Sequence, residues 1–188
     1  MSIEQTKYAV VSTENEFEIR DYEPHILAES IVVGALDYAA NAAFYSLFQF
    51  ISGDNLPCAE LEKSMPISQK DMNKRIQMTS PIWLRAGIGN WAVRFMMPAS
   101  YTLENLPQPM NFRVTLCKVP AQRMATVRYS SFWAEKSYLK NKITLESWIK
   151  KVGLTTMGDP IWARYNQPFM PWFWRRNEVL IPIGLTAH

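Results

Sequence analysis

Hydrophobic and polar positions alternate near the start of the chain, and this alternation predicts strands. Residues 8–11 are apolar and β-branched, and the stretch STENE that follows them is rich in turn-forming residues. Phe17 and Ile19 then alternate with charged neighbours, as in a strand that is buried on one side. Pro24 interrupts the alternation because proline has no N–H to donate to a sheet. An apolar run over 26–33 predicts a further strand.

A helical period replaces the alternation after these strands. Asp37 is suited to be the N-cap of this helix, and Gly53 to be its left-handed C-terminal stop. At about a hundred degrees per residue, one face is apolar and is expected to pack on the core. This face consists of Ala40, Ala43, Phe44, Leu47, Phe50 and Ile51. The opposite face carries Tyr38, Ala42, Tyr45 and Gln49, with Asn41 and Phe48 at its flank. Rings and amides replace the usual Glu and Lys there, so we expect something to cover this outward face.

The second part of the chain repeats this order of elements. A polar stretch over 54–77 precedes a predicted hairpin over 78–98, and a proline-rich connector follows. Strands on both sides of Pro120 then lead to a second helix that ends at Gly153, and 179–183 reads as the closing strand. The second helix has an ordinary core stripe of Ala134, Tyr138, Leu145, Trp148, Ile149 and Val152.

One phrase, Met-x-x-Pro-Ile-Trp, occurs twice. It appears as MTSPIW at 78–83 and as MGDPIW at 157–162, at the same place in the order of elements. We interpret this as an internal duplication, with halves at about 7–98 and 111–184. Two equivalent halves would pair about a pseudo-twofold axis and share a core.

The composition favours a soluble protein with a sizeable core. The chain has 188 residues, of which 48% are hydrophobic, and its net charge of +3 is too small to indicate a nucleic-acid partner. No apolar run is long enough to span a bilayer, and the first residues do not read as a signal peptide. We therefore expect a cytoplasmic protein without an integral membrane segment. The oligomeric state stays open.

Motifs for catalysis or structural metal binding are absent from the sequence. It contains no GxSxG, Walker loop, GxGxxG, HExxH or CxxC, so we expect no enzymatic reaction. A turn histidine is the simpler interpretation of His25, and a metal ligand is the alternative. Cys58 and Cys117 lie far apart, and a disulfide between them stays open.

The stretch QPFMPWFWRRNEV crowds aromatic rings between prolines. One interpretation is a structural clasp, in which Arg175 and Arg176 pair with a carboxylate such as Glu178. The other is a lid over a flat, apolar, anionic ligand, with the outward face of the first helix as the opposite wall. For the two arginines we favour the structural role.

Several of these segments, taken together, resemble the SOUL/haem-binding-protein family. They are FEIRDYEPHILAE, ISGDN, MTSPIW, VRFMMP, YTLENLPQP, ARYNQPFMPWF and RRNEV, and they extend the resemblance over nearly the whole chain, as one domain. The resemblance implies an α+β fold in which duplicated β-β-α-β-β halves form a distorted, mostly antiparallel, barrel-like sheet flanked by two helices. It also implies kinship of fold with small-molecule-binding domains related to the gyrase inhibitor.

The resemblance implies a haem groove on the outward face of the first helix. Carried over by position, the groove consists of Asn41, Phe44, Tyr45, Phe48, Gln49 and Met170. Trp172 would add stacking area, and Tyr45, His25 or Met170 could reach the iron. Animal members of the family offer basic residues to the propionates where this chain has Asn41, Gln49 and Met170, so the charge clamp is thinner.

We therefore expect a protein that binds haem or another tetrapyrrole, in haem buffering, transport or sensing. Two alternatives stay open. The first is a binding module for another flat, amphipathic molecule in a cleft between the halves, lined by Trp83, Trp91 or Trp162 with Glu18 or Glu178 inside. The second is a protein-interaction domain in which the aromatic helix face docks a partner.

Overall fold

The computed structural model describes residues 3–57, 73–166 and 169–185. In this part of the chain, two helices accompany antiparallel strands, which confirms the predicted α+β class. Cys58, His188 and most of the predicted polar stretch over 54–77 lie outside the described residues. None of the described helices combines the length and the apolar character needed to cross a membrane.

The described residues form two compact units, and each unit contains segments from both sequence halves. Unit 1 takes its residues from 1–5, 25–80 and 87–119, and unit 2 takes its residues from 6–24, 81–86 and 120–188. The units therefore do not coincide with the two contiguous halves. The internal duplication itself stays an interpretation.

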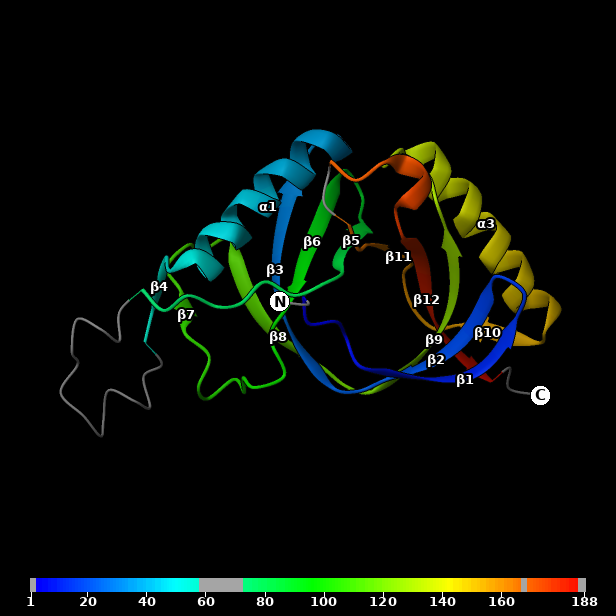
Figure 1. Cartoon of the computed structure of the whole chain (residues 1–188), viewed down its shortest axis with the longest axis horizontal. Coiled ribbons are helices and arrows are strands. Elements are labelled where there is room, and N and C mark those ends of the chain that lie inside the picture. The colour runs from blue at the N-terminus through cyan, green and yellow to red at the C-terminus, as the bar shows by residue number, and fades with distance from the viewer. Residues whose placement is uncertain (1–2, 58–72, 167–168, 186–188) are drawn as a thin grey trace. The chain divides into compact units, whose positions relative to one another are not determined.

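Unit 1 consists of one helix on a small antiparallel sheet. Strand β3 (His25–Val33) lies between β6 (Asn90–Met96) and β8 (Val114–Val119), and it pairs with both. Helix α1 (Leu36–Ser52) lies across β3 and β6 (Figure 1). The short strands β4 (Asn55–Leu56) and β7 (Gln108–Pro109) form a separate pair. The core between helix and sheet includes Ala28, Ala39, Ala43, Leu47, Phe50 and Phe95.

Helix α1 begins earlier than expected and ends where expected. Its N-cap is Ala35, whose extended backbone precedes the first helical residue, so the prediction of Asp37 as N-cap is wrong. Gly53 has a φ of 121° and its N–H bonds to the last turn, which confirms the predicted stop. Ala40 and Phe44 were predicted in the core and are half-buried instead, because they lie at the edge of the buried stripe.

Unit 2 contains a longer antiparallel sheet with the strand order β1-β2-β9-β12-β11-β5. These strands are β1 (Tyr8–Glu14), β2 (Phe17–Tyr22), β9 (Gln122–Tyr129), β12 (Asn177–Leu185), β11 (Ile161–Arg164) and β5 (Ile82–Ala86). A further strand, β10 (Leu154–Thr156), also pairs with β12. Helix α3 (Glu135–Lys151) lies across β9, β10 and β12 (Figure 1), and a 3₁₀ turn, η1 (Trp172–Trp174), precedes β12.

The core stripe of α3 is confirmed at its centre and wrong at its ends. Tyr138, Leu145, Trp148 and Ile149 are buried. Ala134 and Val152 are the N-cap and the C-cap of the helix, and both are exposed. The prediction is wrong for these two residues because the helical period does not continue past the ends of the helix.

The two Met-x-x-Pro-Ile-Trp phrases end on neighbouring strands of unit 2. Strand β5 carries the first Ile-Trp pair and β11 carries the second, and the two strands pair antiparallel. Trp83 lies opposite Ala163, and Trp162 lies opposite Leu84. A twofold relation between the two phrases would produce this register. Both indoles are buried, so each phrase places its tryptophan in the core.

Candidate functional site

The outward face of α1 is exposed, as its sequence predicts. Tyr38 and Tyr45 are 69% and 63% exposed, and Phe48 is 45% exposed. Asn41 is also exposed, and Gln49 is half-buried. Apolar rings of this size are seldom left together on a surface without a ligand or partner.

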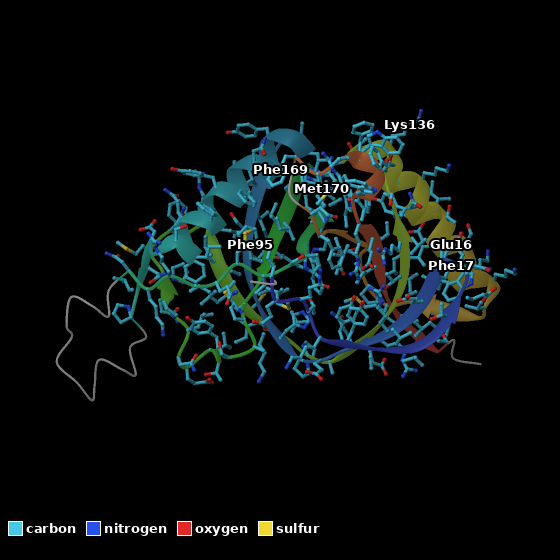
Figure 2. All side chains as sticks on the ribbon, viewed as in Figure 1. Glu16, Phe17, Phe95, Lys136, Phe169 and Met170 are labelled. Carbon is cyan, nitrogen blue, oxygen red and sulfur yellow. The ribbon has the colours of Figure 1, made fainter. Side chains whose placement is uncertain are left out.

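Phe44 connects this face to the core of unit 1. Its ring stacks on Phe48 with a centroid separation of 6.0 Å, and it meets the edge of Phe95 at 5.3 Å. Figure 2 shows Phe95 on β6, the strand beneath α1. Phe48 thus stacks on one ring, Phe44, which itself packs on the buried ring of Phe95, and this favours one orientation of Phe48.

His25 lies on the sheet on which α1 packs. It is the first residue of β3, it is half-buried, and its backbone is paired with Val119. The outward face of α1 points away from that sheet, so Tyr45 and the strand that carries His25 lie on opposite sides of the helix. Its role as an axial ligand stays a prediction. Among the described residues, no three His, Cys, Asp or Glu side chains gather as a metal site.

Met170 and Trp172 belong to unit 2, in an aromatic segment that leads into η1. Figure 2 labels Met170 and Phe169 on this segment. Met170 is half-buried, whereas Trp172 is 46% exposed and stacks on Phe132 at 5.5 Å. Arg175 donates from Nε to the carbonyl oxygen of Met170 at 2.7 Å, so this arginine holds the segment in place.

A buried ionic cluster in unit 2 is centred on Glu178. Arg20 donates from Nη1 to Oε2 of this carboxylate at 2.8 Å and from Nη2 to Oε1 at 3.1 Å. Arg176 donates from Nε to Oε1 at 2.9 Å, and the Tyr165 hydroxyl donates to Oε2 at 2.7 Å. The pairing of Arg176 with Glu178 agrees with the structural role that the sequence favoured.

Sequence analysis missed Arg20 and Tyr165 as members of this cluster. The alternation along β2 predicted Ile19 inside and Arg20 outside, but Arg20 is only 2% exposed. A register shift in the β1–β2 pairing occurs beside these residues. The closing RRNEV motif, read together with an arginine in a strand, is the signal that could have suggested the pairing.

The charges in the cluster balance when Glu18 is included, because Arg20 also donates from Nε to Oε2 of Glu18 at 2.7 Å. Burial disfavours ionisation of Glu178, but its hydrogen bonds and the charges of Arg20 and Arg176 outweigh burial and hold its pKa below the usual range. Glu178 was also an expected lining residue of an alternative ligand cleft. Its carboxylate is already occupied by three donors, and Trp83, Trp91 and Trp162 are all buried.

Buried tyrosines in unit 2 predict sensitivity to alkali. Burial raises the pKa of Tyr138 to about 12 and that of Tyr165 well above its usual 10.0. Their neutral hydroxyls stabilise the fold fully below about pH 10, and this stability is lost as the pH rises further, because the unfolded chain then releases protons. We therefore expect the free energy of unfolding, measured in urea, to be lower at about pH 11 than at about pH 8. The Tyr138→Phe variant should lose less unfolding free energy between these two pH values than the unchanged protein. An equal loss would contradict the role given to the Tyr138 hydroxyl.

Solved structures share the fold at very low sequence identity. The C-terminal domain of EcmrR matches with a TM-score of 0.58 and 14% identity, over 90% of this chain and 98% of that chain. An EcmrR chain in a complex with DNA matches with a TM-score of 0.61 and 12% identity, over 90% of this chain and 57% of that one. An uncharacterized conserved protein from Listeria innocua gives 0.59 and 11%, over 92% and 94% of the two chains. At these identities the likeness shows the fold alone.

The comparison with sequence families is more specific. No functionally curated protein matches the chain. The SOUL heme-binding protein family, in contrast, matches over residues 3–182. This match takes in both units and both Met-x-x-Pro-Ile-Trp phrases. The chain therefore belongs to the SOUL heme-binding protein family.

Proposed function

We propose that this protein binds haem, or a related tetrapyrrole, on the outward face of α1. The observation that supports the proposal most is the exposed aromatic face of Tyr38, Tyr45 and Phe48, in a chain whose family is described as haem-binding. Binding without a chemical step would suit haem buffering, transport or sensing.

The apolar part of this face fits a flat macrocycle. Tyr45 and Phe48 offer ring area, and the small side chain of Ala42 lies on the same side of the helical wheel as Tyr38 and Tyr45. Phe48 is ordered by its stack on Phe44. A ring pair contributes about 0.5–1.5 kcal/mol beyond the burial of its area. Several weak contacts of this kind would add to a usable affinity.

The polar part of this face offers amides in place of charges. Helix α1 contains no lysine or arginine, so Asn41 and Gln49 are the groups on it that would donate hydrogen bonds to the propionates. An amide bonds a carboxylate less strongly than a guanidinium does. The affinity for haem should therefore come mainly from ring contacts. It should depend only weakly on salt concentration, because α1 offers the propionates no positively charged partner.

Tyr45 is the residue of this face that would reach the iron. Haem, when bound, supplies an iron centre that accepts an axial ligand such as a tyrosine, histidine or methionine. Tyr45 presents an exposed phenol in the middle of the aromatic face. His25 and Met170 keep their roles as predicted alternatives, and Trp172 keeps its role as predicted stacking residue.

A hemin titration of the whole chain, followed through the Soret band, tests the proposal. We expect saturable one-to-one binding, with an altered band in Tyr45→Phe because this variant keeps the ring and removes the hydroxyl. Phe48→Ala should weaken binding about tenfold, which corresponds to the loss of one stacked, buried ring. Phe112→Ala is the matched control, since Phe112 is 90% exposed in the same unit but is not part of α1.

The other predicted residues are tested in the same titration. His25→Ala, Met170→Ala and Trp172→Ala each measure one contribution separately. A spectral change in His25→Ala but not in Tyr45→Phe would move the ligand to the histidine. A broad, non-saturating band that is equal in every variant would contradict the proposal.

A further inference from the structure

A second aromatic surface belongs to unit 2 and is built from rings that support one another. Phe132 stacks on Trp172 at 5.5 Å, and Trp172, Phe173 and Trp174 meet edge to face along η1. We call these four rings, together with the exposed ring of Phe169 three positions before Trp172 in the chain, the η1 aromatic cluster. Phe169 and Trp174 project furthest, with 81% and 70% of their surface exposed.

Helix α3 starts beside this cluster and presents a basic outward face. Phe132 precedes the first helical residue, Glu135, by three positions, and Figure 2 shows Lys136 at this end of the helix. On the helical wheel, the side opposite the buried stripe carries the exposed residues Lys136, Leu139, Lys140, Ile143, Lys150 and Lys151. We call this set the basic face of α3.

The apolar residues of the basic face continue the aromatic cluster along the helix. Leu139 and Ile143 are 43% and 61% exposed, although the buried stripe of α3 already supplies its core contacts. Glu146, an acidic residue at the flank of this face, is paired with Lys142 at 3.7 Å, which offsets its charge. The surface thus combines projecting rings, exposed aliphatic residues and an excess of positive charge.

We infer that this surface docks on an anionic phospholipid membrane. Tryptophan and phenylalanine favour the interface between lipid headgroups and hydrocarbon, and lysines beside them are attracted to anionic headgroups. The five rings are 46–81% exposed, so a folded protein partner would need a matching hollow for each of them. The headgroup layer of a membrane is soft and needs no such match.

This inference is independent of the proposed haem site, which lies on α1 in the other unit. Trp172 is a predicted haem residue, so the variants for this test leave it unchanged. Phe169→Ala with Trp174→Ala removes the two most projecting rings, and Lys136→Gln with Lys140→Gln removes two charges. Both double variants change exposed side chains, so we expect the fold to be kept.

Co-sedimentation with vesicles tests the inference. Vesicles of phosphatidylcholine with about 30% phosphatidylserine should bind the protein, and pure phosphatidylcholine vesicles should bind it at least about tenfold less tightly. The double lysine variant should bind about thirtyfold less tightly, and the double ring variant should also bind more weakly. Phe112→Ala and Lys118→Gln, which change exposed residues of unit 1, are the matched controls and should bind as the unchanged protein does.

Brominated lipids give a second readout, because they quench tryptophans that enter the membrane interface. Quenching should be reduced in Trp174→Ala. The inference is overturned if anionic vesicles do not bind, or if binding is unchanged in both double variants. It is also overturned if the ring variant abolishes self-association measured without lipid, because a second copy would then be the partner. In the lysine variant, hemin binding should be unchanged.

Discussion

Replacement of Glu178 by glutamine is expected to lower the free energy of unfolding by about 3–5 kcal/mol. The carboxylate is fully buried, and it receives hydrogen bonds from Arg20, Arg176 and Tyr165. Glutamine keeps the shape but removes the charge, which leaves the buried Arg20 guanidinium with Glu18, through its Nε, as its one carboxylate partner among the described residues. Urea unfolding at neutral pH measures the effect.

Asp21→Asn is the control for this substitution. Asp21 also pairs with an arginine, Arg123, but the two side chains are 45% and 50% exposed. Water screens such a pair, so its loss should change stability little. If the two variants lost equal stability, burial of the Glu178 cluster would not be the cause.

The same cluster predicts a pH dependence with a definite sign. The pKa of Glu178 is lowered in the folded protein, so its contribution is fully present above about pH 4.5 and is lost as the pH falls through the lowered pKa. The stability difference between the unchanged protein and Glu178→Gln should therefore shrink in acid. A difference that stays constant down to about pH 3 would contradict this.

The second large effect is expected at Trp162, where alanine should cost about 3–5 kcal/mol. Trp162 is completely buried, and its ring stacks on Tyr138 at 5.1 Å. The Arg164 guanidinium covers the indole at 3.9 Å from the ring centroid. Alanine would remove these contacts and leave a cavity between α3 and the sheet. Thermal and urea unfolding both measure the loss.

Trp174→Ala is the matched control for Trp162→Ala, because both tryptophans belong to unit 2. Trp174 is 70% exposed, so its removal should change the free energy of unfolding by less than about 0.5 kcal/mol. A small loss at Trp162 would mean that the repeated Met-x-x-Pro-Ile-Trp phrase has another role than packing. A large loss at Trp174 would indicate that η1 contributes to the core.

The elements with a regular period could be predicted from the sequence. In α1, the predicted core residues Ala43, Leu47, Phe50 and Ile51 are buried, and the rings predicted on the opposite face are exposed, so the centre of the stripe and its outward face follow from the helical period. The stop at Gly53 follows from the left-handed backbone that glycine allows. The predicted start of α1 was wrong because the N-cap residue, Ala35, has no side chain that could cap the helix. The sequence therefore contains no capping signal at the true start.

Contacts between distant segments could not be predicted in this way. Arg20 was expected outside because its strand alternates, yet its partner Glu178 lies 158 positions later. A buried arginine is favourable only with ionic partners, and although Glu18 lies two positions before Arg20, no local pattern shows the pairing with Glu178. The same limit applies to the candidate site. The exposure of Tyr45 follows from the helical period of α1. The position of the strand that carries His25 relative to Tyr45, in contrast, depends on how the helix packs on the sheet.

The exchange of strands between the sequence halves has a consequence for synthesis of the chain. β2 is synthesised early, but one of its partners, β9, belongs to the second half. β3 likewise lacks its partner β8 until that strand has also been made. A nascent chain that ends near residue 98 therefore contains several strands, β2, β3 and β5 among them, each with an edge whose partner has not yet been made. Such edges invite association with other chains. Neither half contains all the partners of its own strands, so we expect a fragment cut near residue 98 to associate through these edges, unlike the whole chain.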